Sequence, residues 1–418
     1  MTMSNHPRSR GLHYGWVILT VGTLTVLGSL GFARFGYTMI LPAMQTALGL
    51  SNTQTGGLAT GNFIGYLSLA VIGGFIASRY GPRRVIGVSM LIVGATMALT
   101  GLANSFRAAL MWRVLTGVGS GGSNVPMMAL LPAWFAGRRR GLATGIAVGG
   151  SSVGLMITGP LVPRILDGFG DDGWRYSWFV LGALVVLLGL LAFALLRDRP
   201  EEKGLRPVAA EMSRGAEEQG SGGADWGRVY RSGAVWHLAL VYIAFGLSYI
   251  IYVTFFAKYL QAEGGYTKEA AGNLWAVVGW ISIVCGLIWG TVSDLLGRNY
   301  GLALVYLVQA TSYAVFALWR SPAGYTVSAI LFGLTAWSIP GIVAAACGDY
   351  LGSRLAPAAL GFVTLFFGLG QAAGPSVAGA LADATGSFGP AFLLAAGVAL
   401  LGGLGSLLLR PPRTAVGK

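Results

Sequence analysis

Twelve apolar segments, each about as long as a helix that crosses a bilayer, dominate this sequence. About 20 apolar residues in a helix span the hydrocarbon core of a membrane. A helix also satisfies its own backbone hydrogen bonds where no water is present. The sequence therefore predicts an all-α membrane protein with twelve transmembrane helices. The segments lie at 16–43, 53–77, 83–104, 107–133, 141–165, 174–196, 234–260, 270–293, 299–319, 323–347, 357–382 and 386–409.

Composition and charge placement support this interpretation. Only 10% of the residues are charged and 54% are hydrophobic, whereas soluble domains carry about 25% charged residues. The net charge of +13 would indicate nucleic-acid binding in a soluble protein. Here, with the N-terminus inside, 20 of the 28 Lys and Arg residues lie in the inner segments and 6 in the outer loops or their edges. The positive-inside rule then predicts a multi-pass protein of the inner or plasma membrane with both termini cytoplasmic, and no nucleic-acid partner.

The segments divide into two groups of six. We expect an N-terminal half at 1–196, a charged cytoplasmic linker at 197–233 and a C-terminal half at 234–418. Two motifs recur at almost the same offset along the chain, because Gly159-Pro160 recurs as Gly374-Pro375 and the stretch 74–81 recurs at 290–297. The sequence thus predicts two pseudo-symmetric six-helix halves, which is typical of secondary transporters with a binding site between the halves.

Two arginines lie inside apolar segments that have no acidic neighbours. No Asp or Glu precedes Asp167 in the sequence, yet Arg34 and Arg113 fall within the first and fourth segments. A buried charge without a partner is costly, so an intramembrane arginine indicates a functional site. Arg34 either faces a cavity and pairs with an anionic substrate, or it bonds backbone carbonyls and tethers helices. Arg113 lies nearer the outer end of its segment, where its side chain could instead extend to the interface.

Other polar and aromatic residues in the spans are candidates for the same site. Tyr37 follows Arg34 at i+3, and the buried amides Asn62 and Asn124 need hydrogen-bond partners. In the second half, Tyr249 and Tyr252 are spaced to share a helix face, although aromatic residues at this spacing also pack in cores. The predicted substrate-binding residues are Arg34, Tyr37, Asn62, Asn124, Tyr249, Tyr252, Trp275 and Gln371, and Trp280 is a further lining candidate.

Two glycine-rich patterns imitate enzyme motifs. One is G-x-G-x-x-G at 117–122 and the other is G-x-S-x-G at 150–154, but both lie inside apolar helices. The first motif needs a strand before it and the second needs a histidine and an acid nearby. The cysteines Cys285 and Cys347 also lie in apolar segments. We therefore expect neither enzymatic activity nor a cofactor or metal site, and we expect the glycines to serve helix packing.

Several motifs resemble those of the major facilitator superfamily. The stretch 74–84 resembles its G-x-x-x-D-R-x-G-R-R signature, which recurs at 290–298, and Ser78 stands where the first copy would have Asp. The stretch 113–119 is similar to the fourth-helix R-x-x-x-G-x-G motif, and 154–160 to the fifth-helix glycine-proline motif. The resemblance implies gating or conformational roles for Gly74, Arg79, Gly81, Arg83, Arg113, Gly159, Pro160, Gly290, Asp294, Gly297, Arg298, Gly374 and Pro375.

The subfamily resemblance has two parts. The stretch 13–17 is similar to the entry of the first helix in monocarboxylate and oxalate/formate-type carriers. The stretch 34–37, followed by Leu41-Pro42, resembles an uncharacterised bacterial branch. Monocarboxylate carriers have an arginine in the eighth helix, whereas residues 270–293 contain no basic residue. If the substrate is a carboxylate, another group must hold it.

These observations predict a monomeric carrier that moves a small, monocarboxylate-like organic anion by alternating access. No Asp or Glu lies in the middle of a predicted span. The anion would therefore travel with its own proton or exchange for another anion. Two rival interpretations stay open. One is efflux of hydrophobic or weakly polar compounds along the aromatic residues, and the other is a membrane sensor that does not transport.

Overall fold

The computed structural model describes residues 13–137, 139–209, 227–352 and 355–409. Residues 210–226 of the predicted linker lie outside the described residues. The same is true of the basic residues at 8, 10, 138, 214 and 354 and of those after 409, on which the predicted topology partly rests. Apart from an isolated bridge between Phe135 and Val208, the regular structure of the described residues is helical. The all-helical prediction is therefore confirmed.

The first half of the chain folds into one group of helices. A continuous helical run consists of α1 (Tyr14–Val26), the π-helix η1 (Leu27–Phe35) and α2 (Gly36–Leu48). The other helices are α3 (Asn52–Tyr80), α4 (Pro82–Gly101), α5 (Phe106–Trp134), α6 (Arg139–Phe169), α7 (Gly173–Leu195) and the short 3-10 turns η2 (Gly170–Asp172) and η3 (Pro200–Lys203).

The second half forms the other group. Its helices are α8 (Gly227–Arg231), α9 (Gly233–Ala262), α10 (Lys268–Ser282), α11 (Cys285–Leu296), α12 (Arg298–Leu318), α13 (Pro322–Thr335), α14 (Ser338–Leu351), α15 (Ala356–Thr385) and α16 (Gly389–Leu407). Each of the twelve predicted segments thus corresponds to one helix or to a joined run, such as α10 and α11, which meet at a 44° bend.

Length and hydropathy alone identify fewer spans than this. Within the described residues, eight stretches qualify, or ten when two bent pairs are counted. One of the eight, Arg139–Leu195, contains both α6 and α7. These spans give a multi-pass membrane protein.

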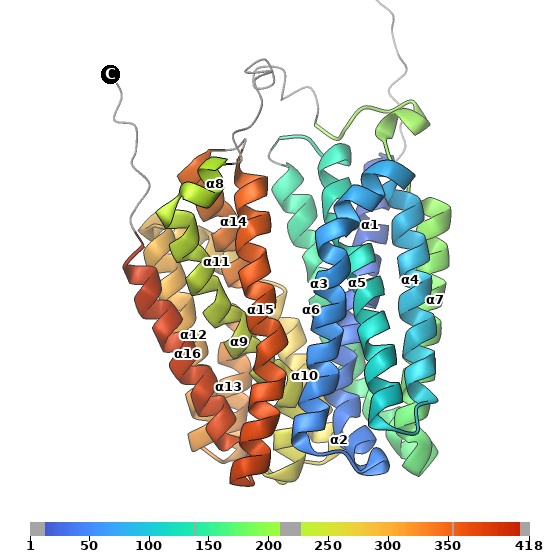
Figure 1. Ribbon diagram of the computed structural model, residues 1–418, viewed down its shortest axis with the longest axis vertical. Helices are drawn as coiled ribbons and strands as arrows, with labels where there is room; N and C mark the ends of the chain where they lie inside the picture. The colour runs from blue at the N-terminus through green and yellow to red at the C-terminus, as the bar shows by residue number, and fades with distance from the viewer. Residues whose placement is uncertain (1–12, 138, 210–226, 353–354, 410–418) are drawn as a thin grey trace, which may run out of the picture.

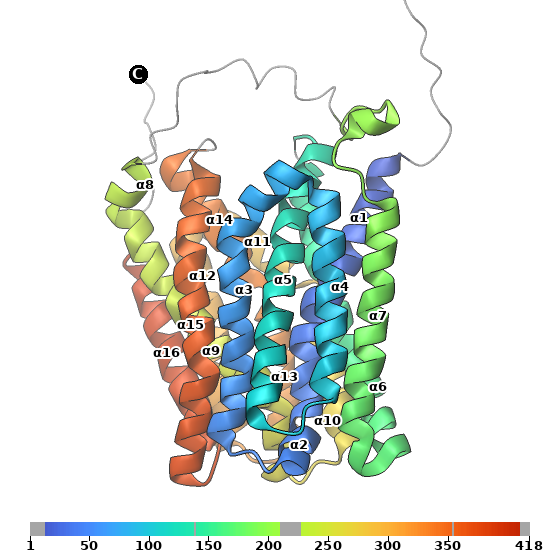
Figure 2. The ribbon, with the colours of Figure 1, turned by 45° about the vertical axis from the view of Figure 1, so that its right-hand side comes forward.

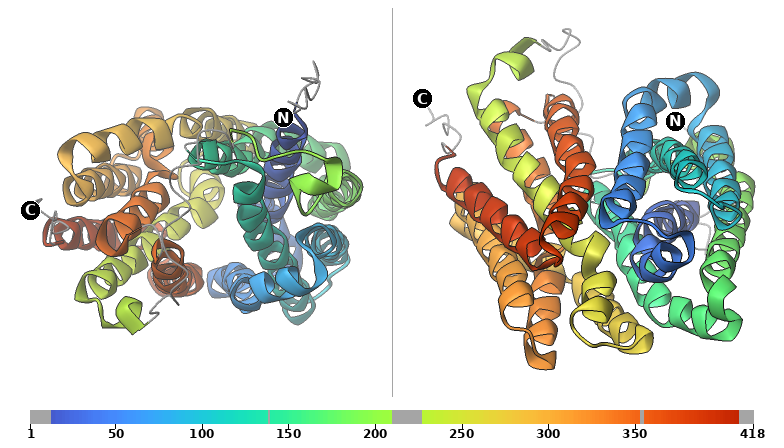
Figure 3. Two further views of the ribbon diagram at one scale, coloured as in Figure 1. Left: turned by 90° about the horizontal axis from the view of Figure 1, so that it is seen from above. Right: turned by 60° about the horizontal axis from the view of Figure 1, so that its bottom comes forward.

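The two groups of helices lie side by side, as the views along and across the long axis show (Figures 1, 2 and 3). We call the end at which α1 begins and α16 ends the terminal end, and the opposite one the far end. At the interface α3 of the first group runs beside α15 of the second (Figures 1 and 2). The groups diverge towards the terminal end (Figure 1).

Polar contacts join the two groups at the far end. The Asp383 carboxylate at the end of α15 accepts hydrogen bonds from the first backbone N–H groups of α3, at Asn52 (3.0 Å) and Thr53 (2.8 Å), and from the Thr53 hydroxyl (2.6 Å). It thus satisfies N–H groups that a helix leaves unpaired, and it complements the helix dipole. On the other side of the interface, Lys268 of α10 pairs with Asp167 of α6 at 3.0 Å.

Glycines let the backbones of the two groups touch in the far half of the interface. Gly159 on α6 lies against the carbonyl of Gly272 on α10, and Gly56 on α3 lies against that of Pro375 on α15. Towards the terminal end the glycines of α6 and α15 no longer touch the other group. A side-chain carbon added at Gly145 of α6 or Gly361 of α15 would meet no atom within 4 Å. The structure is therefore closed at the far end and separated at the terminal end.

The repeated loops show the internal duplication in the backbone. Gly81 joins α3 to α4 with φ of 87°, and its counterpart Gly297 joins α11 to α12 with φ of 98°. Glycine adopts positive φ without steric penalty, which explains why both copies have it. The predicted pseudo-symmetry of the two halves thus extends to the conformation of these turns.

The close approach of α6 to α10 predicts the effect of a larger residue at Gly159. Gly159→Val would push α6 away from the Gly272 carbonyl and should raise the fraction of molecules that are open at the far end. Gly145→Val adds the same atoms to α6 where there is free space. We expect spin labels placed at Ser51 and Thr385 to report longer distances in Gly159→Val and wild-type distances in Gly145→Val. Equal distances in both variants would contradict this.

Candidate binding site between the two groups of helices

Arg34 lies in a π-helix at the interface between the two groups. The nine residues of η1 are π-helical, and Arg34 is the next to last of them. π-Helical turns are rare and are frequent at functional sites. Gly31 of η1 and Gly154 of α6 approach each other so closely that a side-chain carbon on Gly31 would lie 2.8 Å from the Gly154 Cα. This contact presses η1 against α6, and the Arg34 side chain is only 9% exposed.

The Arg34 guanidinium contacts aromatic rings but has no acidic partner among the described residues. Its carbon lies 4.5 Å from the ring centre of Phe63 and 4.6 Å from that of Tyr66, both on α3. Across the interface it interacts with the Tyr249 hydroxyl of α9. Nε and Nη2 of Arg34 are buried and have no hydrogen-bond partner in the described part of the chain. These two atoms form one edge of the guanidinium, whose parallel N–H groups match the two oxygens of a carboxylate or sulfonate.

Arg113 has a different environment. It is 1% exposed, and its Nη1 donates to the Ala33 carbonyl of η1 at 2.7 Å. Its guanidinium carbon lies 4.8 Å from the ring centre of Tyr37 and 5.2 Å from that of Trp178. Arg113 therefore does not extend to an interface, as its place in the segment suggested. Arg113 makes the kind of backbone hydrogen bond that was considered for Arg34 as a helix tether. Its bond to Ala33 joins α5 to the residue before Arg34.

A small cavity separates the two arginines. Its volume is about 10 Å³, which is the space of one water molecule. Asn62 also borders it, and this amide donates to the Arg113 carbonyl at 3.0 Å while its Oδ1 lacks a partner among the described residues. The lining residues are Arg34, Phe35, Tyr37, Thr38, Ala59, Asn62, Phe63, Arg113, Ile250, Val253 and Thr254.

The second group of helices contributes Tyr249 and Gln371 to this region. The Gln371 amide of α15 donates to the Tyr249 hydroxyl, and the Tyr249 ring stacks 4.6 Å from that of Phe245. Next to the cavity, the Thr38 hydroxyl of α2 donates to the Val253 carbonyl of α9 at 2.8 Å. Residues from both halves therefore lie around Arg34, and the location of the binding site stays a prediction.

Other predicted site residues lie elsewhere. The Tyr252 hydroxyl bonds to Ser328 at 2.9 Å, and its ring lies in an aromatic cluster with Phe332 and Phe316 inside the second group. Trp275 is fully buried beside Phe256. Trp280 is 64% exposed. None of these three residues lines the cavity. Tyr249 and Tyr252 were expected to share a helix face, but the Tyr252 side chain packs inside the second group, away from Tyr249 and Gln371.

Two predicted residues take indirect positions. Asn124 donates to the Tyr66 hydroxyl at 3.0 Å, so it supports the ring beneath Arg34 and does not line the cavity. Tyr37 lines the cavity, but its hydroxyl already donates to the Thr55 carbonyl at 2.9 Å. The Tyr37 ring, rather than its hydroxyl, faces Arg113.

Sequence reasoning missed four residues in this region, and two of them are aromatic residues of α3 that contact Arg34. Phe63 and Tyr66 carry the cation–π contacts. The only signal for them in the sequence is their place beside Asn62 in a segment without acids.

The other two missed residues connect breaks in the helices of the second half to α6. Trp337, at the break between α13 and α14, lies 5.3 Å from the Phe35 ring and donates to the Ser152 hydroxyl of α6 at 3.0 Å. Ser152 also accepts from Ser282 at the break between α10 and α11. Pro340 follows the first break and could have indicated it, whereas the second break has no proline beside it.

The predicted gating residues Gly74, Arg79, Gly81 and Arg83, at and around the turn between α3 and α4, lie at the terminal end. The Arg83 backbone N–H, in the first turn of α4, donates to Asp198 at 2.6 Å, and its side chain donates to the Phe193 carbonyl at 2.8 Å. Arg79 lies over the ring of Tyr80. Ser78, which stands in the place of the signature acid, donates to the Phe75 carbonyl of its own helix. The first copy of the loop is thus held by the end of α7.

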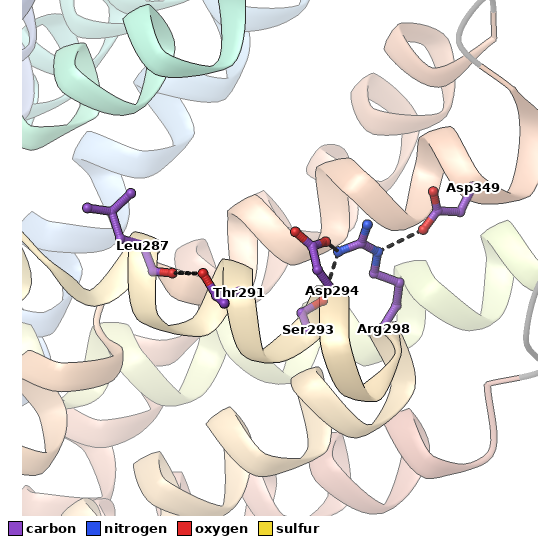
Figure 4. A network of polar contacts seen from close by, with 6 residues as sticks. All are labelled: Leu287, Thr291, Ser293, Asp294, Arg298 and Asp349. Carbon is purple, nitrogen blue, oxygen red and sulfur yellow. Dashed lines mark hydrogen bonds and ion pairs between the residues drawn. The ribbon is translucent and has the colours of Figure 1, made fainter. Parts of the chain in front are cut away.

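The second copy of the loop, which joins α11 to α12, is held by a charged network (Figure 4). Arg298, at the start of α12, pairs with Asp294 of α11 and donates to Asp349 of α14 at 2.7 Å, and it also donates to Ser293 at 3.0 Å. The loss of the signature acid in the first half therefore makes the two loops unequal.

Acidic partners and metal ligands do not gather at the site. The four ion pairs among the described residues all lie near helix ends, and none includes Arg34 or Arg113. No group of three or more His, Cys, Asp or Glu in the described part of the chain could hold a metal ion.

Comparisons with known proteins identify the family. A profile described as the uncharacterised MFS-type transporter YbfB matches residues 26–407. The chain belongs to the major facilitator superfamily. The transporter is 27% identical to a probable sulfoacetate transporter of Cupriavidus necator over 90% of both chains, and 26% identical to a hexuronate transporter of Bacillus subtilis over 92% of both.

Solved structures share the fold. The transporter superposes on a bacterial homologue of the human lysosomal transporter Spinster, in its inward-facing and unoccupied conformation, with a TM-score of 0.72 and 18% identity. The match covers 96% of the transporter and 95% of the Spinster homologue. The resemblance to the superfamily that the motifs indicated is confirmed.

Proposed function

We propose that this transporter moves a small organic anion across the bacterial inner membrane by alternating access, with Arg34 as its anion-binding group. The observation that carries the proposal is the buried Nε and Nη2 edge of Arg34, which has no partner among the described residues. Both relatives described above are named for transport of organic acids, and this supports the substrate class.

The local physics favours an anion over a neutral ligand. An unpaired guanidinium in a low-dielectric interior pays a large desolvation penalty, and only a negative group offsets it fully. A planar fork also selects for ligands with two oxygens on one centre. A carboxylate or sulfonate would accept both N–H groups of Arg34, while the Tyr249 hydroxyl and the Gln371 amide of the other half would bond the rest of the ligand.

The packing of the interface supports a transport cycle. We assign the terminal end to the cytoplasm, because the basic residues gather in the segments at that end. On this assignment the separated terminal end corresponds to an inward-open state, and we propose that the carrier works as a monomer. Opening towards the outside requires the hydrogen bonds of Asp383 to α3 and the Lys268–Asp167 pair to break. An anion that bridges Arg34 and the second half would draw the two groups together at the terminal end and offset that loss.

The coupling mechanism follows from where the acids lie. The described acids nearest the membrane spans are at helix ends: Asp294 and Asp349 at the terminal end, and Asp167, Glu263, Glu269 and Asp383 at the far end. The described residues that line the cavity at Arg34 offer no carboxylate to carry a proton through the site. We propose that the anion enters with its own proton or exchanges for a second anion.

Efflux of hydrophobic compounds has less support. That function would need the aromatic residues of the second half to line a wide cavity. Instead, Tyr252 and Trp275 lie in the packed interior of that half. The charge of Arg34 would also repel lipophilic cations.

The Arg34 proposal predicts a steep loss of anion affinity on substitution. Hydrogen bonds to a charged group contribute about 1.5–3 kcal/mol each, so Arg34→Gln should weaken binding by at least about tenfold. Arg34→Lys keeps the charge but loses the planar pair of donors. Its anion affinity should therefore lie between that of the wild type and that of Arg34→Gln. Thermal shifts of the purified protein with small carboxylates and sulfonates measure this, because a ligand of the native state raises its stability.

Arg107→Gln provides the control for this experiment, because it removes an exposed arginine from the far end. It should leave the anion-induced shift unchanged. An unchanged shift in Arg34→Gln would refute the proposal, and stabilisation by lipophilic compounds alone would favour efflux.

Two tyrosines on α9 provide a second test. Tyr249→Phe removes a hydroxyl that faces Arg34 and should weaken anion binding by about threefold to tenfold, which is the effect of one neutral hydrogen bond. Tyr252→Phe removes a hydroxyl that bonds to Ser328 within the second half and should lower the melting temperature without changing anion affinity. Equal anion affinities of the two variants would show that Tyr249 is not part of the site.

A further inference from the structure

Two tyrosines contact Arg34, one from each half of the chain, and each is hydrogen-bonded to a side-chain amide. The ring centre of Tyr66 on α3 lies 4.6 Å from the Arg34 guanidinium carbon, and the Tyr66 hydroxyl accepts from Asn124 of α5 at 3.0 Å. On the other side of the interface, Tyr249 of α9 interacts with Arg34 and accepts from Gln371 of α15. Each half thus places one tyrosine–amide pair beside Arg34.

The two pairs differ in the hydrogen bonds that they leave unmade. The Tyr249 hydroxyl has two partners, Arg34 and Gln371. The Tyr66 hydroxyl accepts from Asn124, and its own hydrogen has no acceptor among the hydrogen bonds of the described residues. Oδ1 of Asn124 is buried and lacks a partner within the same part of the chain. The Tyr66–Asn124 pair therefore keeps an unused donor beside an unused acceptor.

This balance of one donor and one acceptor holds for either orientation of the Asn124 amide. If the Tyr66 hydroxyl instead donated to Oδ1, the amide N–H groups and the tyrosine oxygen would be left over. Leaving buried polar groups unpaired is costly, so the pair requires a partner that both donates and accepts.

A hydroxyl group meets this requirement. It has one hydrogen to donate and two lone pairs to accept with, whereas a carboxylate oxygen only accepts and a methyl group does neither. Tyr66 and Asn124 are both partly exposed, so they are open to a ligand or to water. A ligand hydroxyl reproduces the hydrogen bonds of a water that it displaces, while an apolar group at the same place loses them.

We propose that the Tyr66–Asn124 pair recognises a hydroxyl group on the transported anion, which narrows the substrate class to hydroxy acids. The inference rests on the proposed function, because Arg34 holds the anionic group of the same ligand. Tyr66 connects the two contacts, since its ring faces Arg34 and its hydroxyl meets Asn124. A short anion bonds to both when its hydroxyl lies on a carbon close to the acid group. Tyr66 and Asn124 are then specificity-determining residues.

Pairs of anions that differ by one hydroxyl test the proposal on the full-length purified protein. Lactate and propionate carry the same carboxylate, and only lactate has a hydroxyl on the next carbon. Titration calorimetry gives the dissociation constant of each anion. We expect one enantiomer of lactate to bind about threefold to tenfold more tightly than propionate, which is the effect of one neutral hydrogen bond. Glycolate should exceed acetate in the same way.

Two variants locate the preference. Tyr66→Phe keeps the ring at Arg34 and removes the hydroxyl, and Asn124→Leu removes the amide. In both variants the ratio of the two dissociation constants should fall to about one. A merely structural role would change both constants by the same factor and leave their ratio at the wild-type value. Tyr252→Phe is the matched control, because it removes a hydroxyl that bonds to Ser328 within the second half, and it should keep the wild-type ratio. If Asn124→Leu does not fold, Tyr66→Phe decides.

Two outcomes would overturn the inference. Equal affinities of the wild type for the hydroxylated and the plain anions would show that the pair binds only water. A preference for lactate that persists in Tyr66→Phe would place the recognition of the hydroxyl elsewhere. Arg34→Gln separates this inference from the proposed function. Anion binding that is lost in Arg34→Gln but shows no preference for a hydroxyl would overturn this inference alone, whereas binding of both anions that is unchanged in Arg34→Gln would overturn the proposed function.

Discussion

Two positive charges, buried without an acidic partner in the described part of the chain, are the constraint on which the rest of this structure depends. Arg113 is held by the Ala33 carbonyl and by two rings, and in return it fixes the end of the π-helix that carries Arg34. Arg34 is left with rings beneath it and a free hydrogen-bonding edge. We propose that this arrangement is kept for an anion, because an anion is the group that offsets the cost of the buried charges.

The contacts around Arg34 join the two groups of helices, and we propose that they link anion binding to conformational change. Glycines let α6 and α10 touch at the far end, and Asp383 caps α3 from the opposite half. These contacts are short-range and polar, so they stabilise the closed far end yet break when the halves rotate apart. Trp337 and Ser152 connect the breaks in the helices of the second half to α6, close to Phe35. Phe35 follows Arg34 in the chain, so these contacts connect the segment that carries Arg34 to the helix breaks of the second half.

The sequence was sufficient for the fold because hydropathy, charge placement and the internal repeat all act at the level of whole helices. It also singled out Arg34 as a candidate, since an arginine is conspicuous in a span without acids. The sequence could not decide which arginine bonds to a backbone carbonyl and which keeps unpaired N–H groups. That difference depends on the π-helix, which has no sequence signature here. Tyr249 and Tyr252 show the same limit. Residues three apart fall short of a full helical turn, so their side chains point in somewhat different directions. On α9 this places Tyr249 at the interface and Tyr252 in the core of the second group. The roles of all these residues in binding stay predictions.

The most direct test of the central claim is an experimental structure of the transporter with a small carboxylate or sulfonate bound. Our account predicts that two oxygens of one anionic group accept hydrogen bonds from Nε and Nη2 of Arg34, with Tyr249 or Gln371 of the other half in contact with the same ligand. An anion bound elsewhere, with the Arg34 edge still unpartnered above Phe63 and Tyr66, would contradict it.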